Sequence, residues 1–299
     1  MQHFAKPDAV AVLCATTSGN IGDHIQTVGL ESAIHKAFGD SCRVVRLRRD
    51  AVSSFREDVP VVVSGWYSHW HAMDFVPAVP YVVAGTILVD AGRKRVSEGL
   101  GQIRGSFGAM DMETIEWCNK SGIDSYFCRS MGLCVPRFAR GSCSKVFLVD
   151  VAPCYDGMLP YIVGSDDVVK TSQQLGSVGS PARAVGLLRR YCSEARLVVT
   201  SDPFVAIPCV AMGVPVVALS AGQQADPRWD ALTGVIPVHT VDACKAGAVD
   251  FDAEPVDASE LSGLLVENLR LSVCEMYGDK SAQDELADVR RKISAFTAI

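Results

Sequence analysis

The sequence lacks several features that would assign it to a broad class of proteins. It has no apolar run of the roughly 18 residues that a membrane-spanning helix needs. It has no excess of basic residues, because 28 Lys and Arg stand against 34 Asp and Glu, giving a net charge of -6. A chain of this charge has no positive field to hold a nucleic-acid backbone or an anionic membrane surface. We therefore expect neither nucleic acid nor a membrane among its partners.

Cysteine pairs at metal-binding or redox spacing are also missing. The 11 cysteines are odd in number, run from Cys14 to Cys274, and include no Cys-x-x-Cys pair. Residues 1–14 do not show the charged start, apolar run and small-residue cleavage site of a secretory signal. We therefore expect a cytoplasmic protein with buried free thiols, and neither a metal site nor a cofactor.

What the sequence does contain is an alternation of strand-like and helix-like segments with short connections. Its 299 residues, 48% of them hydrophobic, are enough for two domains. Such alternation is typical of parallel α/β sheets. The predicted strands are 9–15, 42–47, 59–66, 79–85, 145–151, 161–165, 196–202, 214–220 and 234–239, and the predicted helices are 25–38, 110–123, 182–195, 203–213, 259–277 and 281–296.

The segments form two series of similar length, which predicts two Rossmann-like domains that face a cleft. We place the N-terminal domain at residues 1–138 and the C-terminal domain, including the C-terminal helices, at 139–299. Ligands of such sheets bind beyond the carboxyl ends of the strands. The turns between strands and helices are therefore where site residues are expected.

The turn at residues 18–23 has the features of a ligand-binding loop. Gly22 would let the backbone approach a ligand, and the helix start beside Asn20 offers free N–H groups. Asp23 is a candidate catalytic base, although it could equally serve only to cap the helix.

The turn after the strand at 59–66 is aromatic and rich in histidine, which is unusual for a turn. Trp66 and Tyr67, which follow the candidate Gly65, could bind a sugar or a base by stacking, and His69 could transfer a proton. The alternative is that these aromatic residues pack a domain interface.

Two further turns carry an aspartate at a helix start. Asp111 follows Met110, and Asp202 follows Ser201 and precedes Phe204. Both aspartates are at positions where a carboxylate caps a helix, so a structural role competes with substrate binding.

Taken in order, these turns resemble the motifs of the polysaccharide pyruvyl transferase family, from about residue 9 to residue 232. One branch of that family has Asn-Ile-Gly-Asp-x-Ile-Gln where this chain has residues 20–26, which adds Gln26 to the candidates. The other similar segments are 64–66, 108–114, 122–127, 149–150, 200–204, 208–216 and 226–232.

The resemblance implies a glycosyltransferase-B-like arrangement and transfer of a pyruvyl group from phosphoenolpyruvate to a sugar hydroxyl. Three positions depart from the family pattern: Met110 and Asp202 replace arginines, and Phe204 replaces a histidine. Arg129, with Arg137 and Arg140, could supply replacement cations.

We therefore expect a transferase that modifies a glycan, with a saccharide acceptor and a small anionic or nucleotide-sugar donor. The alternatives are a nucleotide-sugar-dependent glycosyltransferase with Asp23 or His69 as its base, and a non-catalytic saccharide-binding protein or pseudoenzyme. The residues expected to contact substrate are Asn20, Gly22, Gln26, Gly65, Trp66, Tyr67, Met110, Asp111, Arg129, Ser201, Asp202 and Phe204.

Overall fold

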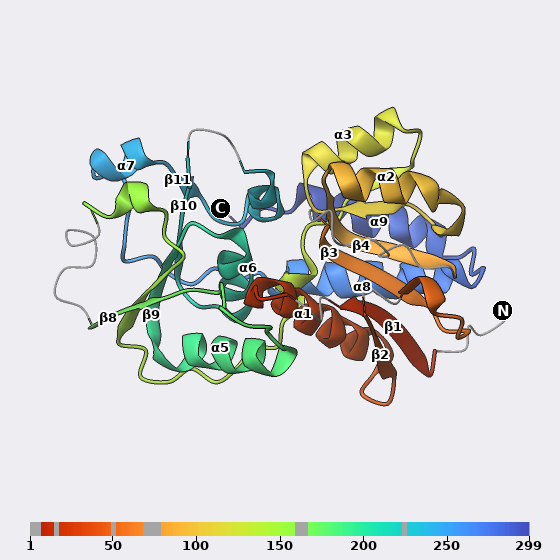
Figure 1. Ribbon diagram of the computed structural model, residues 1–299, viewed down its shortest axis with the longest axis horizontal. Helices are drawn as coiled ribbons and strands as arrows, with labels where there is room; N and C mark the ends of the chain where they lie inside the picture. The colour runs from red at the N-terminus through yellow and green to blue at the C-terminus, as the bar shows by residue number, and fades with distance from the viewer. Residues whose placement is uncertain are drawn as a thin grey trace.

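Two parallel sheets lie side by side in the computed structural model, which describes residues 7–14, 18–48, 52–67, 79–158, 167–222 and 226–298 (Figure 1). The first sheet has six strands in the order β2 (Arg43–Arg48), β1 (Ala9–Cys14), β3 (Val61–Tyr67), β4 (Tyr81–Leu88), β5 (Phe107–Ala109) and β6 (Ser125–Phe127). The second has five, in the order β11 (Val238–His239), β10 (Val216–Leu219), β9 (Ala195–Thr200), β7 (Lys145–Val149) and β8 (Asp167–Thr171).

Both sheets follow the same path. The chain begins in an inner strand, β1 or β7, moves to the edge strand β2 or β8, and then returns to the other side of the starting strand at β3 or β9. The strand order therefore reverses between β1 and β3 and between β7 and β9. Such switch points are where ligands of doubly wound sheets bind.

Helices cover both sheets, as the α/β prediction requires. They are α1 (Ile21–Phe38), α2 (Asp90–Glu98), α3 (Met112–Lys120), α5 (Pro181–Glu194), α6 (Pro203–Met212), α7 (Val241–Lys245), α8 (Ser259–Met276) and α9 (Ala282–Ala295). Three short 3-10 helices, η3 (Met131–Cys134), η4 (Pro153–Tyr155) and η5 (Pro227–Leu232), complete the parts used below. Among the described residues, no helix has the length and apolarity needed to cross a membrane.

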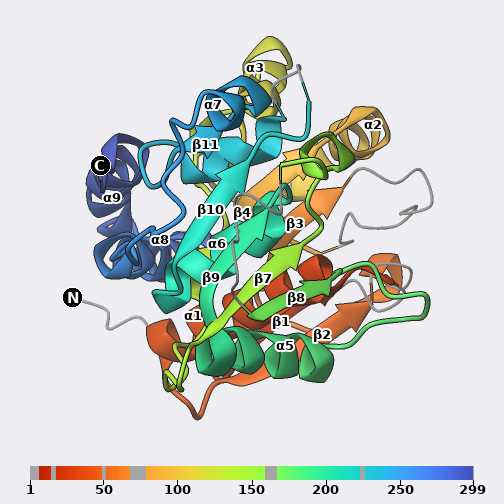
Figure 2. The same cartoon turned by 90° about the vertical axis from the view of Figure 1, so that its left-hand side faces the viewer.

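One hydrophobic core extends through both halves of the molecule. It joins Val10 and Val12 of β1 to Phe147 and Val149 of β7. Helices α1, α5 and α6 contribute to the same core, and Figure 2 shows them beside the strands of the second sheet. The residues that alternate with these along the strands, such as Leu13, point to the opposite face of each sheet. There they belong to two separate hydrophobic clusters, one for each sheet. The halves are thus packed together along these helices.

The last two helices return to the first sheet. Asn268 of α8 donates a hydrogen bond to the Tyr126 hydroxyl on β6 (2.8 Å), and the Arg290 guanidinium of α9 lies 4.1 Å from the centre of the Tyr126 ring. The predicted boundary at 138/139 falls between the two sheets, but it groups α8 and α9 with the second sheet. Their packing is with the first.

The α/β class and most predicted segments are confirmed. Helix α1 begins four residues before the predicted start because Asn20 caps it, its side chain accepting a hydrogen bond from the Gly22 N–H. The edge strand β8 and helix α2 were not predicted, and the predicted strand at 161–165 lies outside the described residues.

Candidate functional site

The loops beyond the carboxyl ends of the two sheets meet each other. The Ile21 N–H donates to the Gln173 carbonyl (2.9 Å), and the Leu175 N–H donates to the Gly19 carbonyl (2.8 Å). These bonds join the start of α1 to the loop after β8. The Met112 N–H at the start of α3 likewise donates to Asp230 in η5 (2.9 Å). The two sheets therefore bring their ligand-binding ends together.

Five residues from both halves gather at this junction, and we call them the Arg228 cluster: Trp66, Asp202, Phe204, Asp226 and Arg228. The Arg228 guanidinium carbon lies 5.0 Å from the Trp66 ring centre and 5.8 Å from that of Phe204. The two rings are 6.1 Å apart and tilted by 37°. A cation is thus held against aromatic faces contributed by β3 and α6.

Two carboxylates surround the same guanidinium. Asp226 engages it closely, with its Oδ2 2.6 Å from one terminal nitrogen of Arg228 and its Oδ1 2.9 Å from Nε. Asp202 is more distant, with an N···O separation of 3.8 Å. The positive charge of Arg228 is therefore largely balanced within the cluster.

The local sequence explains why these side chains point as they do. Asp226 caps η5 by accepting the Arg228 N–H (3.0 Å), and Pro227 between them suits a first helical position. Asp202 caps α6 in the same way, accepting the Phe204 N–H (2.9 Å). Both predicted roles of Asp202, helix cap and site residue, are thus compatible.

Burial controls the protonation of Asp202. It raises the pKa of this carboxyl, and it outweighs the opposing effects of Arg228 and of the hydrogen bond from the Phe204 N–H. Asp150 and Asp226 raise the same pKa further by charge repulsion. Burial therefore makes the Asp202 carboxylate a stronger base than an exposed aspartate.

The turn after β7 brings Asp150 and Ser201 to the second switch point. Asp150 adopts φ 47°, an unusual value outside glycine, and its Oδ2 accepts the Gln173 N–H (2.8 Å). The Ser201 hydroxyl accepts the Ala152 N–H (3.1 Å), which links the turns after β7 and β9. Asp150 lies at the end of a predicted strand and was not among the expected site residues.

Of the two predicted catalytic residues, Asp23 and His69, only Asp23 lies in the part of the chain that the structure describes. The Ser18 hydroxyl donates a hydrogen bond to the half-buried Asp23 (2.5 Å), at the first turn of α1. His69 and the side chain of Tyr67 lie outside the described residues. Their predicted roles stay predictions.

Several predicted substrate contacts instead support the fold. Gln26 is buried and its carbonyl accepts the Ser130 hydroxyl (2.8 Å), which ties α1 to η3. Asp111 caps α3 by accepting both the N–H (2.8 Å) and the hydroxyl (2.7 Å) of Thr114, beside the buried Met110.

The glycines at the two turns relieve crowding and strain. A Cβ on Gly22 would lie 3.0 Å from that of Phe204, so the absence of a side chain lets α1 start against α6. Gly65 has φ 118°, which an L side chain rarely adopts, and it lies at the shift of register between β3 and β4 that follows Val63.

Arg129 does not supply a cation to the cluster, contrary to expectation. Its guanidinium is buried and donates to four backbone carbonyls, those of Ala231, Thr233, Ile293 and Phe296, at 2.8–3.2 Å. Burial lowers the pKa of Arg129 to about 10. The guanidinium at the junction belongs to Arg228, a residue of the 226–232 segment that carried the family resemblance.

No metal centre emerges from the described part of the chain, where no three His, Cys, Asp or Glu side chains are grouped to hold an ion. Eight of the 11 cysteines are buried.

Comparison with known proteins adds a likeness of fold. No family model and no curated protein matches the chain in sequence. An uncharacterized protein from Klebsiella pneumoniae is 12% identical over 76% of this chain and 88% of its own, with a TM-score of 0.52. A periplasmic sugar-binding protein from Pseudomonas fluorescens covers 96% of this chain and 92% of its own at 12% identity, with a TM-score of 0.29. The first likeness concerns the fold alone, and the second carries no argument.

Proposed function

We propose that this chain is a transferase that modifies a glycan, with the Arg228 cluster as its reaction site. The observation that carries the proposal is one guanidinium between the two sheets, against Trp66 and 3.8 Å from the buried carboxylate of Asp202. Such a site requires a cation, a carboxylate of raised pKa and an aromatic face. Here the three lie together where the switch points of the two sheets meet.

Each residue has a distinct part in the proposed reaction. Arg228 binds the phosphate or carboxylate of the donor, for which a guanidinium offers paired N–H donors. Asp202 accepts the proton of the attacking sugar hydroxyl, and Trp66 packs against a sugar ring. Asp23 and His69 are the alternative bases.

The finer reaction follows from the resemblance. It is transfer of a pyruvyl group from phosphoenolpyruvate, in a glycosyltransferase-B-like arrangement of the two domains. Arg228 provides one cation, because Met110 and Asp202 leave the family's two arginine positions without a positive charge. A nucleotide-sugar glycosyltransferase is the alternative with the same architecture.

A thermal-shift titration with phosphoenolpyruvate and a panel of nucleotide sugars tests the proposal. A donor that binds the folded chain raises the melting temperature by mass action, and Arg228→Met should abolish that rise. Arg196→Met is the matched control, because Arg196 forms an ion pair with Asp252 on the surface (3.0 Å). An Arg228→Met variant that responds to the donor as the wild type does would contradict the role of Arg228.

Saccharide binding without catalysis is the second candidate, and the close Asp226–Arg228 ion pair favours it. An anionic donor must compete with that carboxylate for the guanidinium. The outcome that supports this candidate is a thermal shift with neutral saccharides, none with anionic donors, and no phosphate release from phosphoenolpyruvate by ³¹P NMR.

A further inference from the structure

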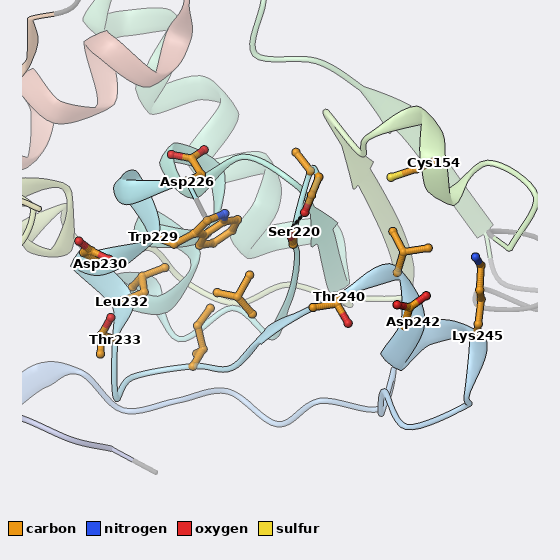
Figure 3. Close-up of a pocket in the computed structure, with 15 residues that line it drawn as sticks. Cys154, Ser220, Asp226, Trp229, Asp230, Leu232, Thr233, Thr240, Asp242 and Lys245 are labelled. Carbon is orange, nitrogen blue, oxygen red and sulfur yellow. Dashed lines mark hydrogen bonds between the residues drawn. The ribbon is translucent and has the colours of Figure 1, made fainter. Parts of the chain in front are cut away.

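A cavity of about 850 Å³ lies beside the carboxyl ends of β10 and β11 (Figure 3). One wall comes from η5 and the residues after it, and the opposite wall comes from α7. The end of β10 at Ser220 and the η4 residue Cys154 complete the lining. Asp226 borders this cavity and also holds Arg228, so the cavity adjoins the Arg228 cluster.

The cavity has an apolar side. It is lined by Trp229, Leu232, Ile236 and Val238. Trp229 is 8% exposed, and its indole N–H has no hydrogen-bond acceptor among the described residues. A cavity of this size with an apolar lining is typical of sites for small organic ligands.

The polar lining is rich in acceptors and poor in cations. Ser220, Thr233 and Thr240 contribute hydroxyls; Asp226, Asp230 and Asp242 contribute carboxylates; Lys245 contributes the one amine. Asp226 is already paired with Arg228, so Asp230 and Asp242 stand against the single Lys245, and this acidic excess would repel a phosphate or carboxylate ligand. An anion is therefore disfavoured here.

The hydrogen bonds already made within the lining leave both donors and acceptors for a ligand. The Ser220 hydroxyl donates to the Gly222 carbonyl (2.8 Å), so its oxygen can still accept. The Thr240 hydroxyl oxygen accepts the Ala243 N–H (3.2 Å), so its proton can still be donated. One oxygen of Asp230 accepts the Met112 N–H, and the other has no partner among the described residues. Groups that donate and accept at once, such as hydroxyls, match this alternation.

We propose that this cavity binds an uncharged polyhydroxylated ligand of one or two sugar rings. The C–H face of a ring packs on the apolar lining, and its hydroxyls bond to the threonines and carboxylates. The identification of this ligand as the acceptor rests on the proposed function, whereas its binding does not.

Calorimetric titration of the full chain with lactose, maltose, cellobiose and chitobiose, and with the 6-phosphate of the same sugars, tests this proposal. At least one neutral disaccharide should bind saturably, and its phosphorylated form should bind roughly tenfold more weakly. Tighter binding of the phosphorylated sugar, or no saturable binding of any neutral disaccharide, overturns the proposal.

Two variants locate the binding. Val238→Trp fills the cavity and should weaken binding by roughly tenfold or more. Val178→Trp, at a residue that is 57% exposed and outside the lining, should leave binding unchanged.

Asp242→Arg, which needs no space in the core, should reduce the difference in affinity between the neutral sugar and its phosphorylated form. The matched control is Asp284→Arg on α9. Unchanged affinity in Val238→Trp and unchanged discrimination in Asp242→Arg would place the ligand elsewhere.

Arg228→Met separates the two proposals. It should remove the response to an anionic donor and leave disaccharide binding intact. If disaccharides bind to this variant and to the wild type while no donor binds to either, the transferase proposal fails and the cavity assignment stands. If disaccharide binding disappears in Arg228→Met but survives Val238→Trp, the cavity assignment fails.

Discussion

At the scale of single residues, burial sets the protonation of three aspartates at the junction of the sheets. Desolvation raises the pKa of Asp111, Asp202 and Asp230 despite the hydrogen bonds that each accepts. A carboxyl with a raised pKa in the folded state binds its proton more tightly there than in the unfolded chain. The stability gained in this way is fully present below the unfolded pKa and is lost as the pH rises through the folded pKa.

Replacing Asp202 by Asn should remove that loss, while the amide still caps α6. We expect the free energy of unfolding of Asp202→Asn, minus that of the wild type, to rise as the pH increases from about 3.8 through the folded pKa. Urea denaturation across this pH range measures the difference.

The control for this prediction is Asp257→Asn. The hydrogen bonds from the Ser259 N–H and hydroxyl and from Arg137 lower the pKa of Asp257, so this carboxylate stabilises the fold above its unfolded pKa and less as the pH falls. The corresponding difference should therefore fall with increasing pH. A difference for Asp202→Asn that is flat or falls would contradict the assignment of burial as the dominant cause.

At the scale of elements, two helical glycines differ in their surroundings: one lies at a close contact between elements and the other on an open surface. A Cβ on Gly29 of α1 would lie 2.2 Å from the Met131 carbonyl oxygen of η3, whereas a Cβ on the exposed Gly186 of α5 would meet nothing within 4 Å. Gly29→Ala should therefore destabilise the chain by about 1–3 kcal/mol. Gly186→Ala should stabilise it by about 0.5–1 kcal/mol, because alanine favours a helix over the unfolded chain.

Urea denaturation of the two glycine variants checks this contrast. Equal effects of the two substitutions would mean that the α1–η3 approach is not as close as the backbone places it.

The elements that the sequence predicted best are those with the most apolar strands. The strands β1, β4 and β10 are buried along their whole length, so each is a continuous apolar run. Strand β8 is an edge strand with half-exposed, polar residues, which gives no such run. Helix α2 has the sequence DAGRKRVSE, in which few apolar residues recur at helical spacing, and it was not predicted.

At the scale of the whole molecule, the shared core predicts one cooperative unit. Trp117 packs against the outer cluster of the first sheet, and Trp229 belongs to the core that joins both sheets. Variants that retain only Trp117 or only Trp229 should show the same urea midpoint by fluorescence, and that midpoint should coincide with far-UV circular dichroism. Two separated midpoints would show that the halves unfold independently.

The candidate site was only partly predictable, for a reason that belongs to this scale. Trp66, Ser201, Asp202 and Phe204 follow strand ends, so a general rule for parallel sheets pointed to them. Arg228 lies in a 3-10 helix far along the chain from Trp66, and no local pattern says that its side chain reaches that ring. The packing of α8 and α9 on the first sheet escaped prediction for the same reason.

The carbonyls that accept hydrogen bonds from Arg129 determine when the first sheet can complete its fold during translation. Two of them, from Ile293 and Phe296, lie more than 160 residues after Arg129 in the sequence. At ordinary rates of synthesis, residues near 295 follow residue 129 by roughly 10–30 s. During that interval the guanidinium has neither partner, and the first sheet has one face without α8 and α9. The nascent N-terminal half must therefore wait until α8 and α9 have been synthesised before its fold can close.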